Sequence, residues 1–338
     1  MEAKQGFIRR GWIGVIIGVA AAGAILSVVY SDLNGKKGSR LGPEFQYNLD
    51  RLLTTDPALI MYEEIEPRID TGFTWPQAIA IGPEGRIYVT GEQAVHTFDA
   101  GGQRLPLAIE LEREATAIAA AEDGSIYLAA GDHIEIYSAS GSLQNRWESA
   151  GPRAVLTSIG VGKEDVFVAD FGSRSVHHYD TTGQLKNTFG DFVLPSSYFD
   201  LAISPDGYVQ VANTGKHRVE EYAFNGNLMT WWGEFSNQDI KGFCGCCNPV
   251  NFALLPNREG FVTCEKGLTR VKIYKPDGAF VGFVAGPEQF TQHESLTAAP
   301  DYCFSRMGLD VAIDAQGRVL VLDPAMGKVR IFKRKQVG

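Results

Sequence analysis

Five cysteines are the residues of this sequence whose spacing points most clearly to chemistry. Their positions are Cys244, Cys246, Cys247, Cys264 and Cys303. The first three form the run Cys-Gly-Cys-Cys, in which Gly245 permits the backbone bend that brings closely spaced thiolates toward one centre. Such thiolates hold an iron–sulfur cluster or another soft metal ion, and the two remaining cysteines would complete the ligand set. The spacing therefore predicts a thiolate-bound cofactor or metal.

Two other uses of these cysteines stay open. Structural disulfides suit an oxidising extracytoplasmic compartment, although five cysteines form at most two bridges and leave one thiol over. The adjacent side chains of Cys246 and Cys247 are expected to diverge, so each would need a distant partner. A reactive, redox-exchanging thiol is the third use.

The elements that must position these residues are set by an internal repeat, which occurs six times in the body of the chain. Its second strands are Ile87–Val89, Ile126–Leu128, Val166–Val168, Val209–Val211, Gly260–Val262 and Val319–Val321. Its third strands are Val95–Phe98, Ile134–Tyr137, Val176–Tyr179, Val219–Tyr222, Val271–Tyr274 and Val329–Phe332. A repeat of about 40 residues with about four strands is typical of a propeller blade, because each small sheet buries its faces only against neighbouring sheets. The repeat therefore predicts an all-β, six-bladed β-propeller.

Two stretches resemble the blades of NHL-repeat propellers, which end the second strand in Val-Ala-Asp or Val-Ala-Asn before a loop with Gly and Arg. They are residues 168–174 (Val-Ala-Asp-Phe-Gly-Ser-Arg) and 211–218 (Val-Ala-Asn-Thr-Gly-Lys-His-Arg). The resemblance covers residues 72–333 and implies the fold without assigning an activity. Gly91 and Gly131 replace the Asp in the first two blades.

A narrower resemblance concerns the cysteine-rich region. Residues 244–249, 261–267 and 271–274 look like a membrane-anchored bacterial subset of NHL proteins that is associated with membrane redox modules. This resemblance implies a protein partner among membrane redox subunits.

Closure of the ring requires a strand from outside the repeats. The sixth blade ends after its third strand at Phe332, which leaves an open sheet edge. Residues Ala58–Ile69 precede the first blade and carry Leu59 to Tyr62, so we expect them to supply the missing outer strand.

Strand direction predicts where the cysteines lie. Loops that join successive blades emerge on the same face as loops between second and third strands, because strands alternate in direction; we call this the upper face. All five cysteines fall in these loops and should converge on one sector of its rim. His217 and His293 are expected on the same face, where each could add a nitrogen ligand.

The N-terminal region predicts a membrane anchor. Trp12–Tyr30 is a run of 19 uncharged, mostly apolar residues, nearly long enough as a helix to cross a bilayer core. Lys4, Arg9 and Arg10 precede it and favour a cytoplasmic N-terminus, which places the body in the periplasm at a bacterial inner membrane. A secretory signal cleaved after Ala24 is the alternative.

The resulting organisation is a tail and transmembrane helix (or uncleaved signal) over 1–31, a linker over 32–57 and the propeller over 58–338. The formal charge is −9, with 40 acidic and 31 basic residues, which argues against a nucleic-acid partner.

Three functions are compatible with these features, and whether the chain is an enzyme stays open. The first is a binding or electron-transfer subunit of a membrane-associated complex, with no catalytic residue assigned. The second is a metal-dependent lyase or hydrolase, for which Asp170, Asn213 and Asp323 would lie near the channel mouth. The commoner role of such residues is to accept backbone hydrogen bonds in their own loops, and we favour that role here. The third is a structural interaction module held by disulfides, with no cofactor.

Overall fold

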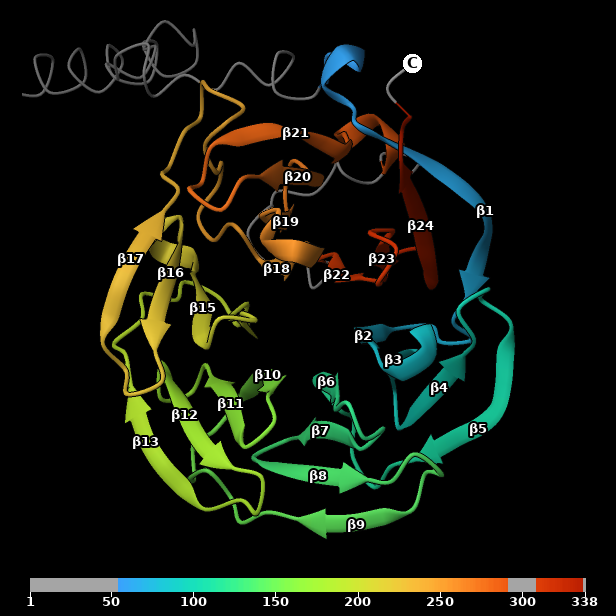
Figure 1. Cartoon of the computed structure of the whole chain (residues 1–338), viewed down its shortest axis with the longest axis vertical. Helices are drawn as coiled ribbons and strands as arrows, with labels where there is room; N and C mark the ends of the chain where they lie inside the picture. The colour runs from blue at the N-terminus through green and yellow to red at the C-terminus, as the bar shows by residue number, and fades with distance from the viewer. Residues whose placement is uncertain (1–53, 291–307, 337–338) are drawn as a thin grey trace, which may run out of the picture. The chain divides into compact units, whose positions relative to one another are not determined.

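The computed structural model describes residues 54–290 and 308–336, which form six four-stranded antiparallel sheets. Figure 1 shows these sheets as blades around a central axis. From the axis outward, blades 1 to 3 contain β2 (Pro76–Ile81), β3 (Ile87–Gly91), β4 (Ala94–Phe98) and β5 (Arg104–Glu110); β6 (Ala117–Ala120), β7 (Ile126–Ala130), β8 (His133–Tyr137) and β9 (Leu143–Arg146); and β10 (Leu156–Val161), β11 (Asp165–Asp170), β12 (Ser175–Asp180) and β13 (Leu185–Phe189).

Blades 4 to 6 follow the same plan, with the outer strand of the last blade taken from the start of the propeller. They contain β14 (Leu201–Ile203), β15 (Tyr208–Asn213), β16 (Arg218–Ala223) and β17 (Leu228–Trp232); β18 (Asn251–Leu254), β19 (Phe261–Glu265), β20 (Arg270–Tyr274) and β21 (Phe280–Ala285); and β22 (Asp310–Ile313), β23 (Val319–Asp323), β24 (Lys328–Arg334) and β1 (Tyr62–Asp70). Short 3-10 turns are η2 (Pro57–Leu59), η3 (Pro83–Gly85), η4 (Thr214–Lys216), η5 (Pro256–Arg258) and η6 (Pro287–Gln289).

The burial pattern explains why the repeat marks the middle strands so clearly. In β7 every residue is buried, whereas in β9, the outer strand of the same blade, every residue is exposed. Middle strands contact the neighbouring blades on both faces, so they carry continuous apolar residues, while outer strands meet solvent. The predicted second and third strands are confirmed in all six blades, except that Gly260 precedes β19.

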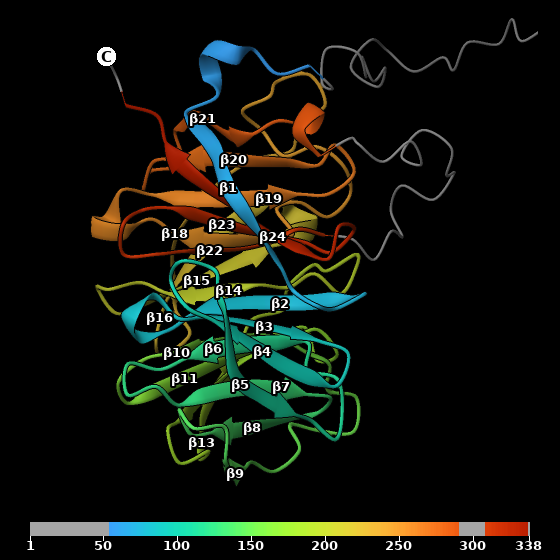
Figure 2. The ribbon, with the colours of Figure 1, turned by 90° about the vertical axis from the view of Figure 1, so that its right-hand side faces the viewer.

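The predicted closure is also confirmed, as β1 pairs antiparallel with β24 (Figures 1 and 2). The register joins Tyr62 to Arg334 at one end and Asp70 to Lys328 at the other. The strand starts four residues later than Ala58, because Pro57–Leu59 form η2 and the Asp56 side chain caps this turn.

The predicted membrane segment, Trp12–Tyr30, lies outside the described residues. In the part of the chain that is described, no helix is long and apolar enough to cross a membrane. The chain divides into Met1–Tyr47 and Asn48–Gly338, and the propeller lies within the second unit.

Candidate functional site

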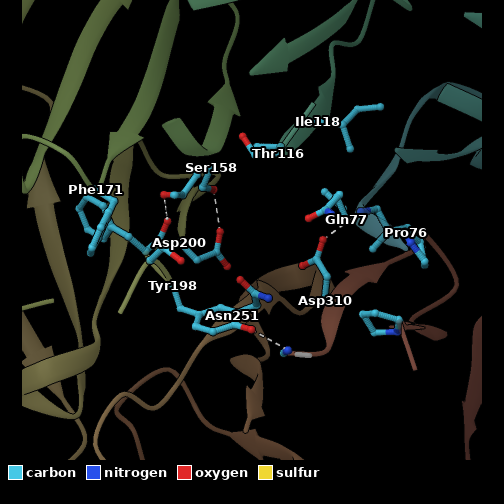
Figure 3. Close-up of a pocket in the computed structure, with 18 of the residues that line it drawn as sticks. Pro76, Gln77, Thr116, Ile118, Ser158, Phe171, Tyr198, Asp200, Asn251 and Asp310 are labelled. Atoms are coloured by element: carbon cyan, nitrogen blue, oxygen red, sulfur yellow. Dashed lines mark hydrogen bonds between the residues drawn. The ribbon is translucent and has the colours of Figure 1, made fainter. Parts of the chain in front are cut away.

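Each blade contributes one polar side chain at the beginning of its innermost strand, and these side chains line a cavity in the central channel. The six residues are Gln77, Thr116, Thr157, Asp200, Asn251 and Asp310. The cavity has a volume of about 1160 Å³. Its lining includes loops that join successive blades and loops between second and third strands, so it opens toward the upper face. We call these six residues the polar ring; all of them except Thr157 are labelled in Figure 3.

Every member of the polar ring is hydrogen-bonded to the following blade. Gln77 Nε2 donates to Glu114 (2.7 Å), Thr116 Oγ1 to Leu156 O (2.6 Å), Thr157 Oγ1 to Phe199 O (2.6 Å) and Asn251 Nδ2 to Leu309 O (2.8 Å), while Asp200 Oδ2 accepts from Phe252 N (2.8 Å) and Asp310 Oδ2 from Ile79 N (2.9 Å). The last bond links blade 6 to blade 1. The polar ring is therefore a closed belt of inter-blade bonds that fixes these side chains at the channel wall.

Asp200 is the first of two carboxyl groups that face the cavity (Figure 3). Its Oδ1 accepts hydrogen bonds from Ser158 Oγ (2.6 Å) and Leu201 N (2.9 Å). Desolvation by the surrounding protein outweighs these bonds and raises its pKa to about 6.

Asp310 is the second and has fewer hydrogen bonds. Its Oδ1 accepts from Val311 N (2.8 Å) and its Oδ2 from Ile79 N. Desolvation, followed by the negative charge of Asp200, raises its pKa to about 7. Both carboxyl groups are only partly accessible although they line the cavity, which is consistent with their desolvation.

These carboxylates keep acceptor capacity toward the cavity. A carboxylate offers about four lone-pair sites, of which Asp200 uses three within the protein and Asp310 two. Within the described residues, neither pairs with a Lys or Arg side chain. The channel wall therefore presents two carboxylates that lack a cationic partner in the part of the chain that the structure describes.

Aromatic and charged residues surround the mouth of the cavity. Trp75 is 56% exposed, and Phe171 and Tyr198 also line the opening. Lys266 Nζ lies 4.7 Å from the centre of the Tyr198 ring. Among the described residues, neither a cysteine nor a histidine lines this cavity.

Three of the predicted cysteines share the segment between β17 and β18. The Sγ atoms of Cys246 and Cys247 lie 3.5 Å apart, so the expectation that these side chains diverge is wrong. They belong to a loop in which Gly245 has a φ of +90°, a conformation that favours glycine. His217 Nε2 donates to the carbonyl of Gly245 (2.6 Å), which confirms that His217 lies beside the cysteine loop.

The other cysteines differ in their surroundings. Cys264, on β19, is fully buried with Val250 and Val271 in an apolar cluster, and burial raises the pKa of its thiol well above the ordinary value. Burial also raises the pKa of Cys244. Among the described residues, no three His, Cys, Asp or Glu side chains are grouped closely enough to hold a metal ion. Cys303 and His293 lie outside the described residues, so a cluster of all five cysteines stays a prediction.

The candidate metal-binding residues Asp170, Asn213 and Asp323 do not line the channel cavity, although the neighbouring residues Phe171 and Pro324 do. Asp170 and Asp323 accept backbone hydrogen bonds within their own loops, from Gly172 N and Met326 N, which confirms the favoured role for these two. Asn213 accepts instead from Val193 N, in the loop between β13 and β14.

Comparisons with known proteins show the fold. No family model matches the chain, and no curated protein does. A solved structure titled streptogramin B lyase is 11% identical, with a TM-score of 0.54, and the match covers 83% of this chain and 100% of that chain. Virginiamycin B lyase from Staphylococcus aureus is 13% identical over 82% of this chain and 90% of that chain, with a TM-score of 0.52. A protein of unknown function from Bacteroides caccae is 18% identical over 64% and 84%, with a TM-score of 0.51. At these identities the likeness shows the propeller architecture alone.

Proposed function

We propose that this chain is a membrane-tethered, periplasmic binding propeller whose channel cavity takes a small organic molecule with a cationic group. The observation that carries the proposal is the pair Asp200 and Asp310, which face the cavity without a cationic partner among the described residues. Desolvation makes the ionised forms of both groups costly, and a bound cation would offset that cost. Ligand binding and ionisation of the pair are then coupled.

The cavity has features that suit such a ligand. Its volume slightly exceeds the common range of about 300–1000 Å³ for small-molecule sites, so it admits a drug-sized molecule together with water. Trp75 and Phe171 provide ring faces near the opening, and aromatic faces attract cations by about 0.5–2 kcal/mol. The Tyr198 ring already holds the Lys266 ammonium. Acceptor sites left on Asp200 and Asp310 would fix the cationic group at the channel wall.

The tether and the partner come from the sequence. The apolar run Trp12–Tyr30 supports an anchor in a bacterial inner membrane, and the cysteine-region resemblance supports a membrane redox subunit as the protein partner. A binding subunit held at the membrane would present its upper face, with cavity and cysteine loop, to that partner.

Calorimetric titration with organic ammonium compounds and their neutral isosteres tests the ligand class. We expect the cations to bind and the isosteres not, with protons released in buffers between about pH 6 and 7, because binding lowers the raised pKa values. Asp310→Asn should weaken binding about tenfold or more. Asp277→Asn, which changes an exposed turn carboxylate, is the matched control and should leave binding unchanged. Equal binding of cations and isosteres would refute the proposal.

An enzymatic role is the second candidate, and one observation favours it. Carboxyl groups with pKa values of about 6 and 7 can accept or donate a proton near neutrality, as general acids and bases do. Two solved structures of similar architecture are named as lyases. Turnover of a streptogramin B antibiotic that disappears in Asp310→Asn would support this role, and binding of cations without turnover of that compound would favour the binding role.

A further inference from the structure

Cys246 and Cys247 form a close thiol pair on the upper face. Their Sγ atoms are 3.5 Å apart in the segment between β17 and β18. A disulfide bond measures about 2.05 Å, so the sulfur atoms need to approach by only about 1.5 Å to bond. Cys246 is exposed, whereas Cys247 is 1% exposed. The Cys246 thiol can therefore react with an external reagent, whereas the Cys247 thiol is shielded from it.

The remaining described cysteines are shielded from external reagents. Cys244 is 5% exposed and Cys264 is fully buried. Among the described cysteines, Cys246 is therefore the one that an external reagent can reach.

Hydrogen bonds hold both ends of the cysteine loop on the propeller. At one end, His217 Nε2 donates to the carbonyl of Gly245. At the other, Asn248 Oδ1 accepts from Lys266 N (2.9 Å), and Asn248 Nδ2 donates to Lys266 O (3.1 Å) and to Cys244 O. The thiol pair thus lies between two fixed points, which keeps the sulfur atoms close together.

The pair also lies next to the wall of the channel cavity. Lys266, which Asn248 binds, lines the cavity together with Tyr198. Cys247 directly precedes Asn248 in the chain, so the thiol pair lies one residue from this contact with the cavity wall. A molecule docked over the upper face would therefore reach the exposed Cys246 thiol.

We infer that Cys246 and Cys247 are a reversible thiol–disulfide site that exchanges two electrons with a disulfide-bearing reagent. The Cys246 thiolate attacks one sulfur of that reagent, which releases the first thiolate and leaves a mixed disulfide. The Cys247 thiolate then attacks Cys246 Sγ and releases the second thiolate. The protein dithiol loses two electrons, the reagent disulfide gains them, and the two protons go to the released thiolates.

The geometry of neighbouring residues favours exchange over a permanent bridge. Adjacent Cα atoms are about 3.8 Å apart, below the usual span of about 4.4–6.8 Å for a disulfide. A disulfide between Cys246 and Cys247 is therefore strained, and strained disulfides are the more easily reduced ones.

Redox titration of the full-length protein in detergent tests this inference. The protein is equilibrated with mixtures of glutathione and glutathione disulfide, free thiols are alkylated, and tryptic peptides are mapped by mass spectrometry. We expect a two-electron transition in which two alkylated thiols per chain disappear, both from the peptide 242–258. Reduction with dithiothreitol should restore them. Phenylarsine oxide, which binds closely spaced dithiols, should bind one equivalent to the reduced form and none to the oxidised form.

Serine variants give the matched controls. Cys246→Ser and Cys247→Ser should each abolish the transition, whereas Cys244→Ser, Cys264→Ser and Cys303→Ser should retain it. A disulfide from either residue to any other cysteine, or a pair that stays reduced in every buffer, would overturn the inference. Peptide 242–258 also contains Cys244, so fragment-ion sequencing of the oxidised natural protein must locate the one alkylated thiol on Cys244. This measurement gives the answer even where a variant does not fold, and it is independent of any cation in the channel.

Discussion

The channel carboxyl Asp310 makes the stability of the propeller depend on pH in a direction opposite to that of most carboxylates. Desolvation raises its pKa in the fold to about 7 from an ordinary value of 3.8. The folded state therefore binds a proton more tightly than the unfolded chain does. Its contribution to the free energy of unfolding is fully retained below about pH 4 and falls as the pH rises toward 7.

The magnitude follows from the two pKa values. Where the folded state holds one more proton, the free energy of unfolding changes by about 1.4 kcal/mol per pH unit. Asp310→Asn removes this titration. Integrating between about pH 5 and pH 8, we expect the variant to gain roughly 2.5 kcal/mol relative to the natural protein. The amide also loses an acceptor toward Ile79 N or Val311 N, but this loss is the same at every pH and leaves the slope intact.

Urea denaturation of both proteins at several pH values measures this slope. The difference in unfolding free energy between variant and natural protein is the quantity to plot, because the contributions of groups that do not interact with Asp310 cancel. Asp277→Asn shows how much of the slope an exposed turn carboxylate contributes. A flat difference plot for Asp310→Asn, or one of opposite sign, would mean that Asp310 stays ionised across this range and that the desolvation argument is wrong.

Two further changes test the closure of the ring and the base of the cysteine segment. Ile69→Ala in β1 removes a side chain that is 3% exposed and should lower the free energy of unfolding in urea by about 2–5 kcal/mol. Its control, Glu63→Ala on the exposed face of β1, should lower it by less than about 0.5 kcal/mol. Equal effects would show that β1 does not bury its apolar face. Lys272→Met removes one of the cations that pair with the buried carboxylate of Glu265 and should lower the free energy of unfolding by about 3–5 kcal/mol. Arg334→Met, which breaks an exposed ion pair, is the control and should lower it by less than about 1 kcal/mol. A loss under about 1 kcal/mol for Lys272→Met would contradict the role of the buried pair.

The architecture could be predicted from the sequence because its signals are local. A run such as Ile87–Val89 between Gly turns already specifies a buried middle strand, and six such runs leave few folds open. The sixth repeat contains only three strands, and this predicted that the segment before the first blade supplies the fourth. The later start of β1 depended on the cap that Asp56 gives to η2, which the pattern of apolar residues does not reveal.

The candidate site could not be predicted in the same way, because its properties arise from assembly. Asp200 and Asp310 are 110 positions apart, and only ring closure brings them to one channel. The visible signal was a polar residue at the same place in every repeat, followed by an apolar strand. The pKa shifts depend on desolvation by neighbouring blades, and the meeting of Cys246 with Cys247 depends on loop backbone that no repeat specifies.

Buried charge explains how an insertion that breaks the repeat keeps a defined structure. Lys272 Nζ donates to the carbonyls of Ile240 (2.9 Å) and Gly242 (2.7 Å), and it pairs with Glu265 although both side chains are fully buried. Cys244 N donates weakly to the same Glu265 carboxylate (3.4 Å). Backbone carbonyls of a loop packed against a blade need hydrogen-bond donors. Lys272 of β20 supplies these donors, and the carboxylate of Glu265 on β19 orients the Lys272 side chain. Blade 5 thus fixes the base of the cysteine segment through buried charged contacts, at the start of the loop that carries the exposed thiol.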